Sequence, residues 1–248
     1  MTHETTDFGF RQVAKQDKQH LVEQVFTSVA SRYDLMNDLM SGGIHRLWKR
    51  HFVATSGIQK GHRVLDLAGG TGDIARLLMP QIGSQGHVVL GDINRAMLDV
   101  GEARLIDAGF HGRFSCQQMD AEQLPCEDNY FDAITMAFGL RNVTDKQQAL
   151  NEMYRVLKPG GKALVLEFSK VTQPLLEKLY RLYSFKLLPE IGHRVTGDRD
   201  SYQYLVESIE KHPDQEQLKA MFEQAGLDMC GYQNLSAGIV AIHSGFKL

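Results

Sequence analysis

Cysteine is scarce in this chain of 248 residues, and the three that occur, Cys116, Cys126 and Cys230, form no CxxC pair. Neither a disulfide scaffold nor a cysteine-based metal site is therefore expected. Positive charge is not in excess either, because 27 Lys and Arg face 30 Asp and Glu and leave a formal net charge of −3. Proteins that follow nucleic-acid phosphates usually have the opposite balance, so we expect no nucleic-acid partner.

Long hydrophobic runs are missing as well, and no stretch approaches the roughly 18 apolar residues of a membrane span. The first twenty residues are polar and lack the apolar centre of a signal peptide, which predicts a cytoplasmic protein with a frayed start over residues 1–20. The histidines show no HExxH spacing, so we expect no metal. Overall, 43% hydrophobic and 23% charged residues are ordinary values for a globular protein.

From residue 63 onward, short apolar runs alternate with helical patterns. Such alternation predicts an α/β fold, namely a Rossmann-like, doubly wound, mostly parallel sheet of seven strands. The expected strands cover residues 63–69, 87–93, 113–120, 131–138, 162–168, 227–236 and 238–247.

The whole chain, 1–248, is expected to form a single domain with two additions. An N-terminal helical cap covers 21–58, and a helical insertion on the substrate side covers 172–212. Both should lie at the carboxyl edge of the sheet, where doubly wound folds bind ligands. Between the fourth and fifth strands, Thr144 and Gln147 have the spacing of a helix capping box.

A glycine-rich turn, DLAGGTGD from Asp66 to Asp73, connects the first strand to the helix after it. Glycines here let the backbone turn sharply and approach a ligand closely. Asp92 ends the second strand, where a carboxylate can accept both hydroxyls of a ribose. Together these features predict a site for an adenosine-containing cofactor.

A glycine turn followed by a carboxylate at the end of the next strand suits either a dinucleotide or S-adenosylmethionine. The charges of Asp66 and Asp73 favour one of the two. Against the pyrophosphate of a dinucleotide, each carboxylate at ~4 Å would cost about 4 kcal/mol at an effective dielectric constant near 20. S-adenosylmethionine presents a sulfonium and an ammonium instead, so the acidic turn favours it. The dinucleotide alternative keeps a loose Gly70-x-Gly72-x-x-Ala75 fingerprint and the Tyr154-x-x-x-Lys158 spacing of short-chain dehydrogenases.

These motifs resemble those of class I S-adenosylmethionine-dependent methyltransferases, in which an acidic GDI and an LKPGG turn also occur. Longer stretches resemble one branch specifically, the ubiquinone/menaquinone biosynthesis C-methyltransferases. They are YDLMNDLMSGGIHRLWK (33–49), AFGLRNVTDKQQALNEMYRVLKPGGKALVLEFSK (137–170) and LPEIGHRVTGDRDSYQYLVESI (188–209). The resemblance runs from about Phe26 to the end of the chain.

For the cofactor, the resemblance implies that Thr71 contacts the methionyl part, Asp92 the ribose, and Asp120 with Ala121 the adenine. Ala137 stands where this branch often has Ser, so a hydrogen bond to the cofactor is lost there or supplied by water. The full set of expected cofactor-binding residues is Asp66, Gly69, Gly70, Thr71, Gly72, Asp92, Asp120, Ala121 and Ala137.

The resemblance also implies methyl transfer to a ring carbon of a polyprenylated quinol, either a 2-methoxy-6-polyprenyl-1,4-benzoquinol or demethylmenaquinol. Arg141 and Asn142, directly after the fourth strand, are the candidates for holding the quinolate oxygen, and a loop salt bridge is the alternative for Arg141. Tyr33 is a candidate for closing the N-terminal helices over the methyl group, with ordinary helix capping as the alternative. His45 is a candidate proton acceptor, with an ordinary surface position as the alternative. Glu167, at the end of the fifth strand, either faces the site or caps a helix.

Other function classes remain open at this point, namely an NAD(P)-dependent oxidoreductase and a non-catalytic cofactor-binding assembly subunit. A polyprenyl tail implies a peripheral membrane surface on the cytoplasmic face as partner, and this branch implies contacts with other quinone-biosynthesis enzymes. Residues 172–188 offer a membrane contact or, alternatively, a lid, and Trp48 offers a second contact. The residues concerned are Leu175, Leu176, Leu179, Leu182, Tyr183 and Leu187, with Lys178, Arg181 and Lys186.

Overall fold

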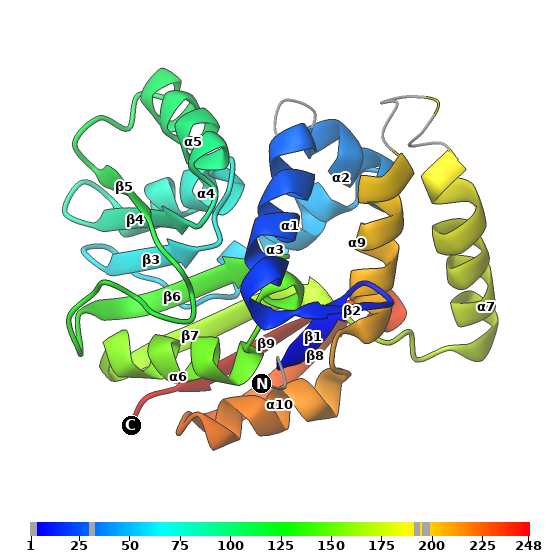
Figure 1. Cartoon of the computed structure of the whole chain (residues 1–248). Coiled ribbons are helices and arrows are strands. Elements are labelled where there is room, and N and C mark those ends of the chain that lie inside the picture. Colours follow the sequence, from blue (N-terminus) through cyan, green and yellow to red (C-terminus); the bar gives the residue numbers. More distant parts are fainter. Residues whose placement is uncertain (1–3, 30–32, 191–193, 195–198) are drawn as a thin grey trace.

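The computed structural model describes residues 4–29, 33–190, 194 and 199–248. Its centre is a seven-stranded sheet of order β5-β4-β3-β6-β7-β9-β8 (Figure 1). The first five strands of this order pair in parallel, and β9 is antiparallel to both of its neighbours. The predicted fold class is confirmed. The strands are β3 (Arg63–Leu67), β4 (His87–Asp92), β5 (Phe114–Gln118), β6 (Phe131–Ala137), β7 (Leu157–Phe168), β8 (Asp228–Leu235) and β9 (Val240–Phe246).

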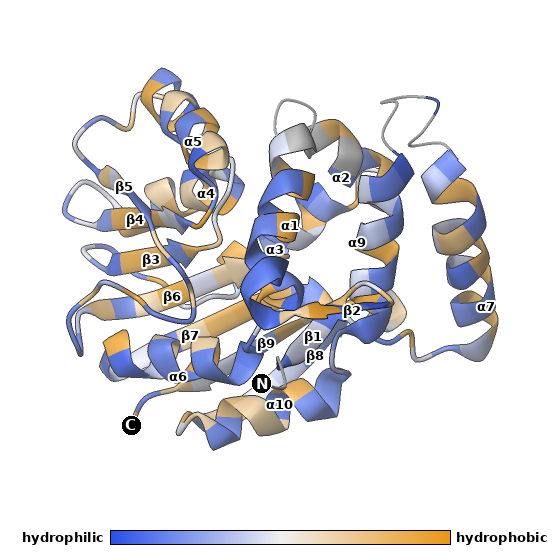
Figure 2. Cartoon of the chain, viewed as in Figure 1, coloured by the Kyte–Doolittle hydropathy of each residue, from blue (hydrophilic) through white to orange (hydrophobic). Residues whose placement is uncertain are grey.

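Helices cover both faces of this sheet because its strands are apolar on both sides (Figure 2). Val64 packs into the layer beneath α3, α4 and α9, whereas its neighbour Leu65 packs against α6 and α10. Leu164 and Val165 divide in the same way, as the two-residue period of a strand requires. The helices are α3 (His45–Ala54), α4 (Asp73–Ile82), α5 (Arg95–Asp107), α6 (Lys146–Val156), α9 (Arg199–Lys211) and α10 (Gln215–Gln224).

The start of α6 differs by one residue from the predicted capping box. Asp145, not Thr144, is the N-cap, and its side chain accepts a hydrogen bond of 3.0 Å from the backbone N–H of Gln148. A carboxylate favours this position more strongly than a hydroxyl because it also complements the positive end of the helix. The helix ends at Val156, so β7 begins before the predicted Lys162.

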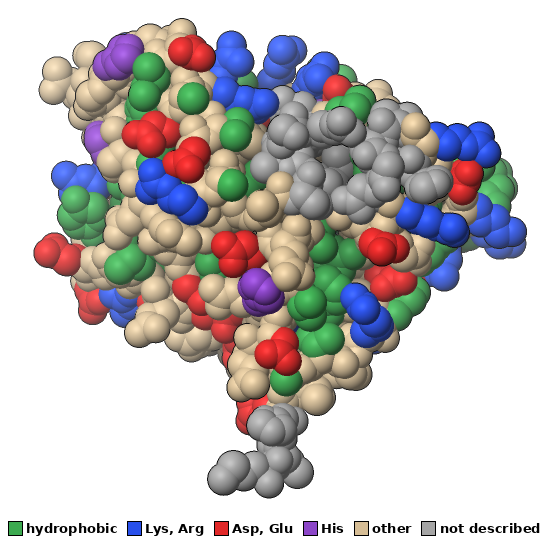
Figure 3. Space-filling model, turned by 45° about the horizontal axis from the view of Figure 1, so that its top comes forward, with side chains coloured by type: hydrophobic (Ala, Val, Ile, Leu, Met, Phe, Trp, Pro, Cys, Tyr) green, Lys and Arg blue, Asp and Glu red, His purple; other side chains and the backbone are tan. Residues whose placement is uncertain are grey.

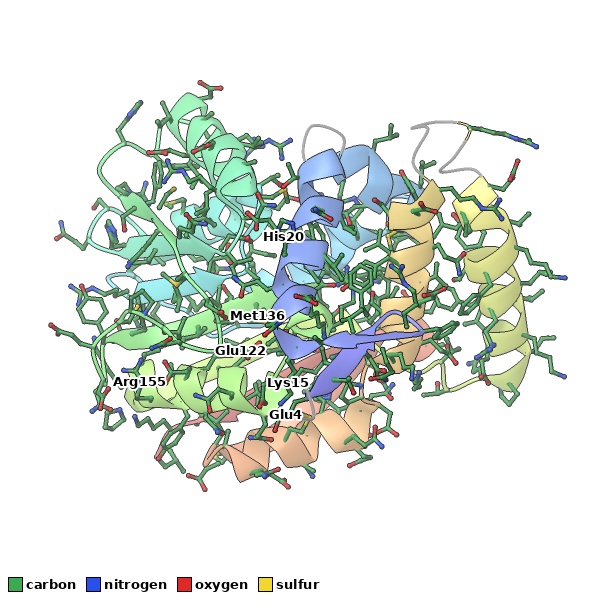
Figure 4. The ribbon with its side chains drawn as sticks, viewed as in Figure 1. Glu4, Lys15, His20, Glu122, Met136 and Arg155 are labelled. Carbon is green, nitrogen blue, oxygen red and sulfur yellow. The ribbon has the colours of Figure 1, made fainter. Side chains whose placement is uncertain are left out.

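The expectation of a frayed start is wrong for the described part of residues 1–20. β1 (Thr5–Phe8) and β2 (Arg11–Ala14) form an antiparallel hairpin, and α1 (Lys15–Val29) follows at once. An ion pair of 2.7 Å between Glu4 and Lys15 lies where the hairpin meets α1 (Figure 4). The hairpin is held in place by packing on α9, since Phe8 is buried against Tyr204.

The remaining elements surround the carboxyl edge of the parallel strands. Trp48, predicted as a second membrane contact, is instead buried in α3, where its Nε1 donates to the Ser236 hydroxyl at 2.9 Å. Among the helices that the structure describes, none is long and apolar enough to cross a bilayer. The remaining elements are α2 (Tyr33–Ser41), α7 (Pro174–Leu182), the π-helical η3 (Tyr183–Leu187) and the 3-10 turns η2 (Leu140–Asn142) and η4 (Ser236–Gly238).

Candidate functional site

A deep cleft opens at the carboxyl ends of β3, β4 and β6, beneath α1. It contains about 840 Å³ of empty space, part of it open to solvent. The lining residues are Gln19, Val22, Glu23, Phe26, Leu67, Ala68, Gly70, Asp92, Ile93, Asn94, Met97, Met119, Asp120, Ala121, Glu122, Phe138, Gly139, Asn142, Val143 and Thr144.

Gly70 brings the backbone of the glycine turn to the wall of this cleft. Its φ of +53° lies in the left-handed region, and a Cβ there would stand 3.1 Å from Cε of Met97. Its N–H donates a hydrogen bond of 2.8 Å to Oδ2 of Asp92, which ties the turn to the end of β4. A side chain at this position would therefore strain the backbone and narrow the cleft.

Asp92 is the central charged group of the cleft. Oδ1 accepts the N–H of Asn94 at 2.9 Å, and Oδ2 accepts that of Gly70, so the carboxylate has a fixed orientation. Burial raises the pKa of Asp92 to about 6, although these backbone hydrogen bonds lower it. Hydroxyl donors from a ligand would favour the charged form further.

The predicted ligand-facing role of Asp66 is not supported by its position. The residue is fully buried, and its carboxylate accepts the N–H of Ala75 at 2.9 Å and the hydroxyl of Thr135 at 3.0 Å. Burial raises the pKa of Asp66 to about 7, which further reduces its charge. Asp66 therefore supports the turn from behind and is not among the residues that line the cleft.

Asp73 also differs from the prediction, because two cations neutralise it. Lys49 lies 2.6 Å and Arg104 3.7 Å from its carboxylate. Burial alone would raise the pKa of Asp73, but Lys49 and Arg104 lower it to below its ordinary value. The acidic character that was predicted for the turn thus does not come from Asp66 and Asp73.

Four other carboxylates supply the negative charge: Glu23, Asp92, Asp120 and Glu122. Among the described residues that line the cleft there is no Lys or Arg. Glu122, near the lower end of α1 in Figure 4, is turned to the backbone, since its Oε1 accepts the N–H groups of Thr144 and Asp145. The preference for a cationic ligand therefore stands, but on different residues from those predicted.

The other expected cofactor residues fall into two groups. Asp120 and Ala121 line the cleft, and the Asp120 carboxylate accepts the N–H of Glu122 at 2.9 Å. Thr71 is buried, with only 2% of its surface exposed. The predicted residues that are not part of the cleft lining are Asp66, Gly69, Thr71, Gly72 and Ala137.

Arg141 and Asn142 lie together in η2 but have different surroundings. Asn142 lines the cleft, whereas Arg141 is buried behind it, with Nη1 2.9 Å from Oε1 of Glu167. Nη1 also donates to the carbonyl of Phe138. The buried Nε of Arg141 has no hydrogen-bond partner among the described atoms. The salt bridge that was the alternative for Arg141 is therefore present, and Glu167 is its buried partner.

His45 does not join this group of residues. The surface position that was the alternative for His45 is wrong, because the residue is 4% exposed and its Nε2 lies 2.9 Å from Asp38. Burial lowers the pKa of His45, with Asp38 opposing that shift. The residue is not part of the cleft lining. Tyr33 begins α2, and its side chain lies outside the described part of the chain.

Several lining residues escaped the sequence analysis, above all Gln19, Val22, Glu23 and Phe26. They share one face of α1, at helical spacing, so the apolar periodicity of Val22 and Phe26 was the available signal. Asn94 was missed as well, although it follows Asp92 closely. Its side chain caps α5 through the N–H of Met97 and donates to the Thr27 hydroxyl of α1 at 2.9 Å.

The dehydrogenase pattern finds no support in the geometry. Lys158 pairs with Asp132 at 2.6 Å, and the ring of Tyr154 lies under the ammonium of Lys247. Neither Tyr154 nor Lys158 lines the cleft. Within the described residues, no cluster of three or more His, Cys, Asp or Glu side chains could hold a metal ion.

Comparison with known proteins gives a consistent family assignment. The model of the ubiE/COQ5 methyltransferase family matches residues 11–247. Proteins named ubiquinone/menaquinone biosynthesis C-methyltransferase UbiE are similar over nearly the full chain. The one from Xylella fastidiosa (strain M23) is 61% identical, with 98% of this chain and 96% of that protein covered. The one from Xanthomonas campestris pv. campestris is 60% identical, with 100% and 98% covered.

Several solved structures with a similar fold are described as methyltransferases, and their sequence identity to this chain is low. A SAM-dependent methyltransferase from Aquifex aeolicus has a TM-score of 0.63 at 16% identity, covering 86% of this chain and 97% of that one. A second, from Thermotoga maritima and described as a possible histamine N-methyltransferase, has a TM-score of 0.62 at 18% identity, covering 93% and 100%. These likenesses concern the fold.

Proposed function

Since this chain belongs to the ubiE/COQ5 methyltransferase family, we propose that it moves the methyl group of S-adenosylmethionine to a ring carbon of a polyprenylated quinol. The expected acceptor is 2-methoxy-6-polyprenyl-1,4-benzoquinol, demethylmenaquinol or both, and the relatives are named for ubiquinone/menaquinone biosynthesis. The observation that carries the proposal is the acidic cleft beside the glycine turn. Its four carboxylates suit a ligand with a sulfonium and an ammonium better than a pyrophosphate.

In the proposed binding mode, four residues of the cleft lining have a task. Asp92 accepts the ribose hydroxyls, and Asp120 with Ala121 holds the adenine. Gly70 lets the backbone approach the ligand. When bound, S-adenosylmethionine supplies an electrophilic methyl group, and no metal is needed for its transfer.

At the acceptor side, the residues of this chain have to position a quinol and stabilise its anion. Loss of a hydroxyl proton raises electron density at the neighbouring ring carbon, which would attack the methyl group in line. The bond between sulfur and the methyl group would break, S-adenosylhomocysteine would leave, and the methylated ring carbon would then lose its own proton to restore the aromatic ring. We place the quinol oxygen beside Asn142, in front of Arg141. The Nε of Arg141 is a donor that the quinolate oxygen, or a water that takes up the proton, would satisfy.

Turnover with a labelled methyl donor tests this function directly. A short-chain quinol and S-adenosylmethionine labelled in its methyl group should give a labelled quinol, with the label on a ring carbon. A folded protein that binds S-adenosylmethionine but transfers no label would instead support the non-catalytic assembly subunit. Bound nicotinamide in the purified protein would support the oxidoreductase.

We also propose that α7 binds the surface of a lipid bilayer. A polyprenyl tail is nearly insoluble in water, so the enzyme has to take its substrate from the membrane. None of the residues of α7 is buried, and Leu175, Leu179 and Leu182 are 74%, 57% and 49% exposed. Their spacing of four and three residues places them on one face of the helix. Lys178 and Lys186 add positive charge for anionic head groups. Figure 3 shows Lys, Arg and hydrophobic side chains intermingled at the right-hand edge, where α7 lies.

Vesicle flotation should detect this contact. The triple change Lys178→Gln, Arg181→Gln, Lys186→Gln should lower the bound fraction on anionic vesicles at least tenfold, because each basic residue near such a surface contributes about 1 kcal/mol. Added salt should release the wild type in the same way.

The control for this experiment removes the same charge elsewhere. Lys60→Gln, Arg76→Gln and Arg95→Gln alter exposed residues near β3, α4 and α5, on the opposite side of the molecule from α7 (Figure 1). This variant should float like the wild type. Equal flotation of the α7 variant and the wild type would show that α7 is not the membrane contact.

A further inference from the structure

Asn142 is held from outside the cleft by a tyrosine of α9. The hydroxyl of Tyr204 donates to Oδ1 of Asn142 at 3.1 Å. The tyrosine is 5% exposed, and burial raises its pKa above the ordinary value, so its hydroxyl keeps its proton. Because an amide has one acceptor oxygen and two N–H donors, engaging Oδ1 in this way leaves the NH₂ group of Asn142 for other partners.

Tyr204 is in turn supported by the N-terminal hairpin. The ring of Phe8 stacks on that of Tyr204, with centroids 4.3 Å apart and an interplanar angle of 21°. Phe8 itself is 5% exposed and belongs to a small apolar cluster with Val22 of α1. The stacked pair fixes the ring of Tyr204 and therefore the place of its hydroxyl.

Two further contacts attach the hairpin to the same face of α9. The N–H of Phe10 donates to Oε2 of Glu207 at 2.9 Å, and Lys211 lies 3.5 Å from Asp7. Tyr204, Glu207 and Lys211 are spaced by three and four residues, so they share one face of the helix. The turn of the hairpin fits tightly there, because a Cβ on Gly9 would stand 2.3 Å from Oε2 of Glu207.

The backbone of Asn142 is fixed from another direction. Oε2 of Glu167, in β7, accepts the N–H of Arg141 at 3.2 Å, and the N–H of Asn142 donates to the carbonyl of Gly139 at 3.0 Å. Since β7 holds the main chain of η2, the hydrogen bond from Tyr204 determines whether the NH₂ group or Oδ1 of Asn142 faces the cleft.

We propose that Tyr204 is a positioning residue for methyl transfer, and that the hairpin β1–β2 acts through it. Tyr204 turns the NH₂ group of Asn142 toward the cleft, where it donates to the oxygen of the quinol. The inference rests on the proposed function, because it assigns a task to Asn142 in that reaction. It gives residues 5–14, far from the glycine turn in sequence, a role in turnover.

A double-mutant cycle tests the proposal. Tyr204→Phe keeps the ring and its stacking on Phe8 but removes the hydroxyl, and we expect it to lower kcat at least tenfold. The affinity for S-adenosylmethionine and the melting temperature should stay close to those of the wild type. In an Asn142→Ala background, adding Tyr204→Phe should lower kcat no further, since the amide it orients is gone. Additive effects, or full activity of Tyr204→Phe, would overturn the proposal.

The hairpin is tested at Phe8. Phe8→Ala should lower kcat in the same direction without weakening the affinity for S-adenosylmethionine, and Phe8→Tyr, which keeps an aromatic ring, should restore most of it. A Phe8→Ala variant with wild-type kcat would refute the part assigned to the hairpin.

A control and the wild type separate the possible failures. Tyr232→Phe removes the hydroxyl of a tyrosine in the edge strand β8, where it bonds to Glu216, and should leave kcat unchanged. If the wild type itself transfers no methyl group, the proposed function fails. If the wild type is active and the cycle is additive, only the positioning role fails.

Discussion

Asp92→Ala is expected to weaken binding of S-adenosylmethionine at least a hundredfold in isothermal titration calorimetry. The variant lacks the carboxylate and therefore the two hydrogen bonds that it accepts from the ribose hydroxyls. Each of these is worth about 1.5–3 kcal/mol because the acceptor is charged. A loss of about 1.4 kcal/mol already corresponds to a factor of ten. The variant also loses the anchor of the glycine turn, since Oδ2 of Asp92 holds the N–H of Gly70.

Asp99→Ala is the matched control, because it removes an exposed acid from α5 that pairs only with Arg95 in the described contacts. Its affinity should equal that of the wild type. An Asp92→Ala protein that is folded by circular dichroism and binds with unchanged affinity would remove Asp92 from the cofactor site.

The raised pKa of Asp92 adds a pH dependence to this prediction. Burial raises the pKa of Asp92 to about 6, so the carboxylate of the ligand-free protein takes up a proton as the pH falls through that value. The ribose hydroxyls donate to the ionised carboxylate of Asp92, and protonation removes that acceptor. The affinity of the wild type for S-adenosylmethionine should therefore decline below about pH 6. The ratio of wild-type to Asp92→Ala affinity should shrink over the same range, because the variant lacks the titrating group. A ratio that stays constant from pH 5 to 8 would contradict the assignment.

The sequence predicted those site residues whose position follows from the sheet. Asp92 is the last residue of β4, Asn142 comes after the end of β6, and parallel strands bring these carboxyl ends to one edge. Gly70 was predictable from the turn that a strand needs to enter a helix. Asp120 and Ala121 follow β5 in the same manner, and all five line the cleft.

What the sequence could not predict is pairing between distant residues. Nothing near Phe8 indicates a strand, because the partner that buries it, Tyr204, lies far along the chain. Asp66 could equally have faced the ligand, and its burial follows from hydrogen bonds with Ala75 and Thr135. For His45, the sequence left a proton acceptor and a surface position as alternatives, and it could not show the contact with Asp38 that accompanies its burial.

For the same reason, the sequence could not predict which carboxylates give the cleft its negative charge. A count of carboxylates near the glycine turn cannot show that Lys49 neutralises Asp73 or that burial raises the pKa of Asp66. Glu23 was not predicted as a cleft residue because it lies on α1, outside any motif. The preference for a cationic cofactor was therefore right for reasons that only the folded chain supplies.

Replacing Arg141 should have the largest effect on stability. Glu167 is 1% exposed, and its partner Arg141 is 5% exposed. Arg141→Met would leave a buried carboxylate without its cation, which typically costs 3–5 kcal/mol. We expect a fall of about this size in the free energy of unfolding, measured by urea denaturation. The double change Arg141→Met, Glu167→Met should recover much of it, because no buried charge is left unpaired.

Arg141→Lys separates this stabilising role from the role in turnover. Lysine keeps the positive charge beside Glu167, so the loss of stability should be smaller than for Arg141→Met. It lacks the planar guanidinium, which bonds both Glu167 and the Phe138 carbonyl through Nη1 and leaves Nε for the quinol side. We therefore expect a large fall in turnover with little change in affinity for S-adenosylmethionine. The stable double variant should be equally inactive, since restoring the fold does not restore the donor. If Arg141→Lys lost cofactor affinity as strongly as turnover, Arg141 would have to be placed on the cofactor side of the cleft.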